Sequence, residues 1–293
     1  MKDIYRVVGI TKQCFHQWLN RRLLCEADKE QLLPIIFQLR SSHPRLSCRQ
    51  MYNKLSPKSM GRDKFEQFCY ANGYKVPVKR NFRRTTASKG FIRFPNLLLS
   101  LDELTDINQL WVSDITYFDI GTETYYLTFI TDIYNREIIG YNASESLDTE
   151  STTLLCLKMA IKQRMLSKEN KLFFHSDGGG QYYSKKFIAL TRDYNIHNSM
   201  GKTAYENPFA ERINGTIKND YLIPYQPKNL AQLSKLLTKS VWLYNNERPH
   251  KSLYGYSPIE FYSLVKNKLL TKKWVINKKK KEAKKKKVNI IIN

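Results

Sequence analysis

The sequence predicts an α/β protein: a mixed five-stranded sheet flanked by helices and preceded by an all-α region. Apolar residues recur at helical spacing in the first 74 residues, whereas strand-type alternation begins near Leu110. Three strands in succession are joined by short turns, which predicts an antiparallel meander. Strands and helices then alternate along the chain. This order is typical of a sheet covered by helices on its faces.

The N-terminal region carries the first helical pattern. Thr11 fits an N-cap position, and Phe15, Trp18 and Leu19 then fall on one helical face. The pattern fits a small helix-turn-helix whose second helix begins near Thr11, with Lys12 as a DNA contact, and it fits a plain amphipathic helix equally well. Further helices are expected at residues 27–40, 47–55 and 62–72.

The central region is predicted to form the sheet. β-branched and aromatic residues fill its first strand, and a turn at Gly121 closes that strand. The strands are expected at residues 111–119, 125–134, 138–144, 171–177 and 196–199. Helices are expected at residues 148–166, at residues 184–194 and from Asn207 onward.

Charge is distributed unevenly along the 293 residues, whose formal net charge is +23. Residues 1–90 hold 19 Lys and Arg against 6 acids, and residues 266–293 hold 12 Lys against 1 acid. Residues 91–265 are close to neutral, with 18 basic and 19 acidic side chains. Basic flanks around a neutral centre indicate a polyanionic partner. A role in solubility alone is the alternative, but acidic residues serve that purpose better.

The cysteines and histidines exclude some classes of protein. The five cysteines form no C-x-x-C motif and the five histidines no H-x3–5-H motif, so a structural zinc site is not expected. Solitary cysteines fit a reducing cytoplasm, and no apolar run is long enough for a membrane span or a signal peptide. We therefore expect a soluble, cytoplasmic protein.

Three acids stand at positions that favour chemistry. Asp114 lies in the middle of a strand predicted to be buried, where an ionised carboxylate needs a compensating partner. Asp177 ends a strand and precedes three glycines, which let a ligand approach the backbone closely. Glu211 lies on the helix that begins at Asn207 and Pro208.

Glu211 also belongs to a polar stripe on its helix. Asn207, Glu211, Asn214 and Lys218 follow one another at helical spacing, an arrangement that is most often a solvated face. Carboxylates on two strands and a helix nevertheless make a site of hard oxygen ligands for Mg²⁺ or Mn²⁺. Two such ions would support in-line displacement at a phosphodiester. With the basic flanks, this predicts cleavage or transfer of DNA strands.

Several motifs carry a resemblance to a known family. They are Trp111-Val-Ser-Asp114-Ile-Thr-Tyr117, His175-Ser-Asp177-Gly-Gly-Gly-Gln-Tyr182 and Asn207-Pro-Phe-Ala-Glu211 to Lys218. A further one, Tyr244-Asn-Asn-Glu-Arg-Pro-His250, is followed by Tyr256-Ser-Pro258. Together they resemble the DDE core of retroviral-integrase-type transposases, in particular those of the bacterial "IS-three" insertion-sequence family. The resemblance extends over roughly residues 5–262.

The resemblance implies a ribonuclease H-like core whose metal ligands are Asp114, Asp177 and Glu211. It implies an enzyme that nicks element ends and joins 3′-hydroxyls to target DNA with two Mg²⁺ or Mn²⁺ ions. Asn207 and Lys218 would contact terminal nucleotides or the DNA backbone. His175 and Tyr182 would shape the site. Two alternatives stay open for His175 and His250, which could be general bases or structural hydrogen-bonding groups. Arg248 could bind phosphate or cap a helix.

These observations divide the chain into four regions. Residues 1–74 would be the helix-turn-helix-like DNA-binding region, and residues 75–107 a basic linker in which Arg83 and Arg84 lie along phosphates. Residues 108–265 would be the catalytic core, and residues 266–293 a disordered lysine-rich tail.

The resemblance has departures and leaves alternatives open. The segment 199–206 is about two residues shorter than is usual in the family, with Glu206 in place of Asp. No first-frame product is evident, so the chain resembles a second-frame product that could act as a frameshift fusion, and a homo-oligomer on DNA is expected. The alternatives are a ribonuclease H-like nuclease without joining activity, and an inactive DNA-binding relic or regulator.

Overall fold

The computed structural model describes residues 5, 7, 9–77, 94–169, 171–201 and 207–276. The chain divides into two compact units, Met1–Arg80 and Asn81–Asn293, which are considered separately below. The predicted linker contacts Arg83 and Arg84 lie outside the described residues.

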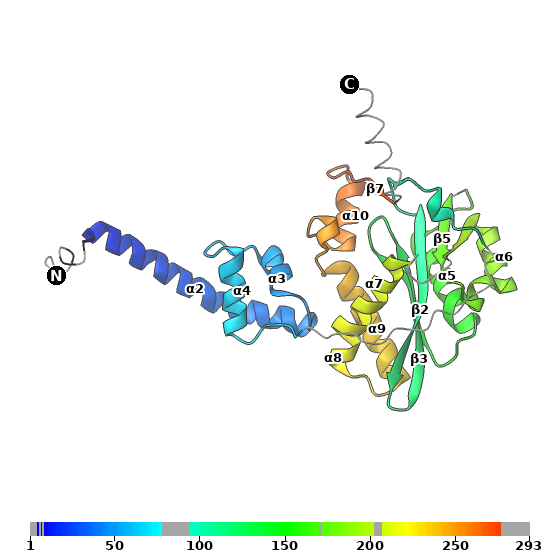
Figure 1. Ribbon diagram of the computed structural model, residues 1–293, viewed down its shortest axis with the longest axis horizontal. Coiled ribbons are helices and arrows are strands. Elements are labelled where there is room, and N and C mark those ends of the chain that lie inside the picture. Colours follow the sequence, from blue (N-terminus) through cyan, green and yellow to red (C-terminus); the bar gives the residue numbers. More distant parts are fainter. Residues whose placement is uncertain are drawn as a thin grey trace, which may run out of the picture. The chain divides into compact units, whose positions relative to one another are not determined.

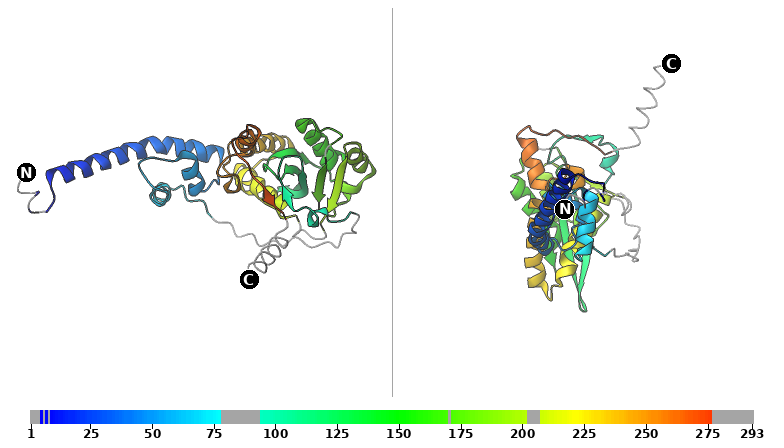
Figure 2. Two further views of the ribbon diagram at one scale, coloured as in Figure 1. Left: turned by 90° about the horizontal axis from the view of Figure 1, so that it is seen from above. Right: turned by 90° about the vertical axis from the view of Figure 1, so that its left-hand side faces the viewer.

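The N-terminal unit is helical, as predicted. It contains α2 (Lys12–Ser42), α3 (Cys48–Leu55) and α4 (Arg62–Ala71). A small core joins the C-terminal part of α2 to the two short helices and includes Leu32, Ile36, Met51 and Phe65. Figure 2 shows the rest of α2 extending beyond α3 and α4.

The helix α2 corrects one expectation, because it is continuous where two helical segments were predicted. Thr11 is its N-cap, with the Cys14 N–H donating to Thr11 Oγ1 at 3.1 Å, and the helix ends at Ser42 just before His43 and Pro44. Good helix formers fill the stretch between the two predicted segments, so nothing interrupts the hydrogen bonding there. A helix preceding Thr11 would fall largely outside the described residues, so the helix-turn-helix stays a prediction.

The C-terminal unit is built on one five-stranded sheet (Figure 1), in the order β4-β3-β2-β5-β6. The strands β2, β3 and β4 pair antiparallel, and β5 and β6 extend the sheet in parallel from β2. The mixed sheet and its flanking helices confirm the predicted ribonuclease H-like fold. The strand bounds are β2 Leu110–Ile120, β3 Glu123–Asp132, β4 Ile138–Ser144, β5 Leu172–Ser176 and β6 Ile196–Met200.

Helices cover both faces of this sheet, as Figure 1 shows. Trp111 and Ile130 pack in the core beneath α5 and α6, whereas Leu127 and Phe129 pack in the core beneath α7 and α9. Gly140 on β4 permits the close approach of α5, because a Cβ there would lie 2.3 Å from the Cys156 carbonyl oxygen. The bounds are α5 Leu155–Arg164, α6 Lys185–Asp193, α7 Pro208–Ile217, α8 Ile223–Tyr225, α9 Leu230–Asn246 and α10 Pro258–Lys266.

Short helical turns complete the unit. A π-helical turn precedes α5, and another continues α7 into α8, so the predicted helix at residues 148–166 is present but irregular at its start. The bounds are η1 Leu97–Leu99, η2 Glu150–Leu154, η3 Gly180–Tyr183, η5 Lys218–Leu222 and η6 Lys251–Leu253.

The edges of the predicted linker and tail are ordered parts of this unit. β1 (Glu103–Leu104) pairs antiparallel with β7 (Trp274–Val275), and Leu104 is fully buried. Two-residue strands give little local signal, and their pairing depends on segments about 170 residues apart, so the sequence pattern did not predict them. The described chain continues to Ile276.

Side chains fasten the turn between β3 and β4 to the helices. Arg164 Nη2 at the end of α5 lies 2.6 Å from Glu137 Oε2 and 3.6 Å from Asp132 Oδ2, and all three side chains are buried. The guanidinium of Arg136, in the same turn, lies 4.5 Å from the ring centres of both Phe209 and Trp274. These contacts connect the start of α7 to the sheet. Among the described helices, none is long and apolar enough to span a membrane.

Candidate active site

The first acid, Asp114, lies in the middle of the central strand β2. The parallel pairing of β2 with β5 matches Val112 to His175, so the next residue on the same face, Asp114, is level with Asp177 just beyond the end of β5. Val112 packs in the cluster that includes Ala210 of α7. The carboxylate of Asp114 therefore lies on the α7 face of the sheet.

The second acid, Asp177, is held by the glycine run that follows it. The N–H of Gly179 donates to Asp177 Oδ1 at 3.1 Å. A Cβ on Gly179 would lie 3.1 Å from the same oxygen, tighter than most such contacts, so glycine suits this position. Burial raises the pKa of Asp177, and the Gly179 N–H partly offsets this effect.

The helix α7 carries the third acid, Glu211, in its first turn. Glu211 is exposed, whereas Asn214, three residues later, is buried and donates from Nδ2 to Asp114 Oδ2 at 2.8 Å. Asn214 therefore holds one carboxylate oxygen of Asp114 in place. The sequence pattern put Asn214 in the polar stripe but did not assign it this contact.

The charges of the other two acids act on Asp114. Burial raises the pKa of Asp114 to about 7, with further contributions from the negative charges of Asp177 and Glu211. Hydrogen bonds from the Ile115 N–H and the Asn214 amide act to lower the pKa of Asp114. A strand-buried carboxylate beside two others is an unfavourable place for negative charge, and a cation or a proton relieves it.

Lys218, one turn beyond the other stripe residues, closes this side of the site. Its Nζ donates to the Tyr117 carbonyl at 2.5 Å and to Thr116 Oγ1 at 3.2 Å. Burial lowers the pKa of Lys218, while the charges of Asp119 and Asp114 act to raise it. The ammonium group is therefore held along β2 within electrostatic reach of the acids.

Asn207, at the start of α7, has its side chain turned toward β2. It occupies the N-cap position of α7, but its side chain makes no capping hydrogen bond and only 3% of the residue is exposed. Its Nδ2 donates instead to the Ser113 carbonyl at 2.9 Å. Three residues of the polar stripe, Asn207, Asn214 and Lys218, therefore point toward β2. The interpretation of the stripe as a solvated face is wrong for these three.

The acids do not by themselves form a preassembled ion cage. Within the described ranges, no group of three or more His, Cys, Asp or Glu side chains is arranged tightly enough to hold a metal ion. Asp114 and Asp177 are level on neighbouring strands, whereas Glu211 is exposed on the helix that packs over them. The donors are carboxylate oxygens, which fit a hard divalent cation.

His175 and Tyr182 are both buried beside the acids. His175 Nδ1 lies 2.9 Å from Ser199 Oγ, and none of the residue is exposed, which favours the structural hydrogen-bonding role over general base catalysis. The Tyr182 hydroxyl lies 2.9 Å from Ser113 Oγ. Ser113 had no sequence signal beyond its position next to Asp114, because buried serines are ordinary in strands.

The other predicted contacts are not gathered at this site. Arg248 Nη2 pairs with Asp220 Oδ2 at 2.7 Å, which favours a structural ion pair over phosphate binding. Burial, with Arg248 and Arg136 nearby, lowers the pKa of His250 to about 3, and its ring packs 4.8 Å from that of Tyr244. His250 is therefore a weak base. Lys12 is the exposed first residue of α2 in the other unit.

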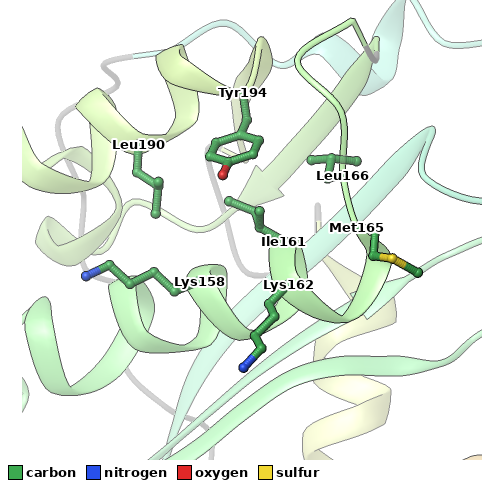
Figure 3. A pocket seen from close by; sticks show the side chains of 7 residues that line it. All are labelled: Lys158, Ile161, Lys162, Met165, Leu166, Leu190 and Tyr194. Carbon is green, nitrogen blue, oxygen red and sulfur yellow. The ribbon is translucent and has the colours of Figure 1, made fainter.

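An open pocket lies on the opposite face of the sheet (Figure 3), between α5 and α6. It has a volume of about 340 Å³, and Figure 3 shows Ile161, Leu190 and Tyr194 directed into it, with Lys158 and Lys162 at its rim. None of the three acids lines it.

Comparison with known proteins agrees with this geometry. Two overlapping models, both described as an integrase core domain, match residues 105–205 and 192–258. A 31 kDa protein of insertion element IS600 from Shigella sonnei is 27% identical over 87% of this chain and 96% of its own length. A transposase-like protein from Haemophilus influenzae is 30% identical over 57% of this chain and 76% of its own length.

The chain belongs to the insertion-sequence transposases with an integrase-type core. A solved structure, the catalytic core of HTLV-2 integrase, is 22% identical and covers 53% of this chain and 96% of its own, with a TM-score of 0.43.

Proposed function

We propose that this transposase cleaves DNA at the ends of an insertion sequence and joins the resulting 3′-hydroxyls to target DNA, with Asp114, Asp177 and Glu211 as its catalytic metal ligands. The observation that supports this most is the pair Asp114 and Asp177, level on neighbouring parallel strands, with the charge of Glu211 close enough to raise the pKa of Asp114. Such a group of neighbouring carboxylates is suited to a divalent cation.

The fit of a metal to these residues is supported by chemistry and charge. All three donors are hard oxygens, which favours Mg²⁺ or Mn²⁺ over zinc. The unfavourable charge at Asp114 is the kind that a bound cation relieves. When bound, two such ions would activate the attacking hydroxyl and stabilise the leaving oxygen.

The protein's own side chains would orient the reacting groups. Asn214 fixes the rotamer of Asp114 through its 2.8 Å hydrogen bond, so that carboxylate does not have to be ordered during the reaction. Lys218, held by the carbonyl of Tyr117, places a positive charge beside the acids, where it would neutralise a DNA phosphate. Gly179 holds Asp177 by its N–H and leaves no side chain in the way of the DNA strand.

DNA binding itself would depend on the basic flanks. The N-terminal 90 residues and the C-terminal 28 residues carry most of the excess positive charge, which fits sequence-independent phosphate contacts. We propose that Lys12, Arg83 and Arg84 belong to these contacts. We also propose an IS-three second-frame product that acts as a homo-oligomer, alone or fused to a first-frame product, because joining two element ends requires at least two DNA-bound copies.

The test is strand transfer of labelled element-end DNA with Mg²⁺. Asp114→Asn, Asp177→Asn and Glu211→Gln should each abolish cleavage and joining, while Asp119→Asn, an exposed acid on the same strand β2, should act like the wild type. Joining by the three variants at the wild-type rate would overturn the assignment. Hydrolysis without joining would favour the plain nuclease, and DNA binding without any cleavage by the wild type would favour the regulator.

A further inference from the structure

Ser113 lies on one of the three segments that carry the proposed acids and is hydrogen-bonded to both of the others. It is fully buried on β2 and directly precedes Asp114. Its Oγ donates to the Phe129 carbonyl at 2.8 Å and lies 2.9 Å from the Tyr182 hydroxyl. Its carbonyl accepts the amide N–H of Asn207 at 2.9 Å.

Two of the partners of Ser113 lie close in sequence to the other two acids. Tyr182 follows Asp177 by five residues, in the turn η3 that the glycine run introduces. Asn207 precedes Glu211 by four residues, at the start of α7. The parallel pairing of β2 with β5 ends at Val112, so the Ser113 carbonyl lies beyond that ladder and takes a side-chain donor instead.

From this arrangement we infer that Asn207 and Tyr182 are positioning residues, which set the spacing of the three carboxylates by fastening the Asp177 turn and the Glu211 helix to the backbone beside Asp114. The inference rests on the proposed function and assigns Asn207 a role other than the DNA contact predicted from sequence. Asn207 is 3% exposed, and its amide donates to a strand carbonyl, so it presents little surface to a nucleotide.

Burial makes these bonds effective as positioning devices. Ser113, Tyr182 and Asn207 are each at most 3% exposed, so no water competes for their hydrogen bonds. Each bond joins a different element, so the loss of one permits a shift of a whole acid-bearing segment and not only of one side chain. Groups that orient metal ligands in this way typically change metal affinity by about 10–100-fold when they are removed.

The variants Asn207→Ala and Tyr182→Phe test this inference in the full-length chain. Their matched controls are Asn245→Ala and Tyr244→Phe. Asn245 is also a buried asparagine whose amide donates to a strand carbonyl, that of Ile138, at 2.8 Å, but on β4 at the far side of the sheet. Tyr244 is 2% exposed and packs against His250.

Three quantities are measured for each variant: the Mn²⁺ dissociation constant by calorimetry without DNA, the affinity for element-end DNA in EDTA, and the thermal unfolding midpoint. We expect Asn207→Ala and Tyr182→Phe to weaken Mn²⁺ binding by about tenfold or more. The affinity for DNA in EDTA should stay within about twofold. The controls should lower the unfolding midpoint comparably and leave Mn²⁺ binding unchanged.

Two results would overturn the inference. Weaker DNA binding by Asn207→Ala in EDTA would show that Asn207 contacts DNA. An equal loss of Mn²⁺ affinity in the controls would show that the loss follows from lower stability of the fold in general. If Asn207→Ala fails to fold, Tyr182→Phe decides, because it removes one hydroxyl only. Asp114→Asn separates the two proposals: wild-type Mn²⁺ affinity in that variant contradicts the proposed function itself.

Discussion

The replacement Asp114→Asn should stabilise the metal-free protein, by an amount that grows with pH. The folded protein holds the pKa of Asp114 at about 7 against an ordinary value of 3.8. Because the folded-state pKa is raised, the protonated carboxyl is tolerated at low pH, and stability is lost as the pH rises from about 4 to about 7. Each unit of pKa shift corresponds to about 1.4 kcal/mol. Asp114 therefore lowers the free energy of unfolding by about 4 kcal/mol above pH 7 and by about 2 kcal/mol at pH 5. Asparagine has the same shape and carries no charge, so it avoids this cost.

Urea denaturation of both proteins from pH 5 to pH 8, with EDTA or with Mg²⁺, measures this difference. In EDTA the advantage of Asp114→Asn should rise by about 2 kcal/mol over that range. Saturating Mg²⁺ should stabilise the wild type and close the gap, because the cation binds only the folded carboxylates. The control Asp119→Asn removes an exposed carboxylate from the same strand. A stability difference that stays constant from pH 5 to pH 8 would refute the electrostatic argument.

Three further predictions concern the rest of the chain. Arg164→Met should lower the free energy of unfolding of the C-terminal unit by about 3–5 kcal/mol, because it leaves the buried Glu137 and Asp132 without their cation. The control Lys162→Met, at an exposed neighbouring position, should change it little when both are measured by urea denaturation. Ser47→Ala removes the hydroxyl that accepts the Gln50 N–H in the capping box of α3 and keeps the bond donated by the backbone N–H of residue 47. It should lower the stability of the N-terminal unit by about 1 kcal/mol in thermal unfolding, whereas full stability would show that this hydroxyl contributes nothing. Removal of residues 277–293 deletes eight lysines and leaves β7 intact. It should flatten the slope of log DNA affinity against log salt concentration by up to about 7. An unchanged slope would mean that this segment does not contact DNA.

Local patterns predicted most of the sheet. Alternation and turn residues placed β2 and β4 within a residue or two of their observed ends, because a strand with one buried face repeats its side chains with a period of two. The continuous helix α2 was missed for a related reason. Apolar periodicity is weak where few side chains of a helix are buried, and of the described side chains of α2 only Leu32 and Ile36 are buried.

Contacts between distant segments could not be predicted in the same way. The pairing of β1 with β7, and the ion pair between Arg248 and Asp220, join residues whose types and spacing carry no sign of one another. Arg248 was expected to bind phosphate or cap a helix, and its observed partner depends on how η5 and α9 pack. An arginine next to a proline has the same sequence appearance in all of these roles.

The sequence by itself determined which residues bear charge and on which elements they lie: Asp114 within a strand, Asp177 at a strand end and Glu211 on a helix. Their chemistry follows from residue type, and their elements follow from local periodicity. Only the tertiary structure decided which groups surround them. The register of β2 with β5 brings Asp114 level with Asp177, and the packing of α7 on β2 turns Asn207 and Asn214 inward, toward Ser113 and Asp114. Registers and helix packing are set by the summed burial of many apolar side chains across the core, which no short motif encodes.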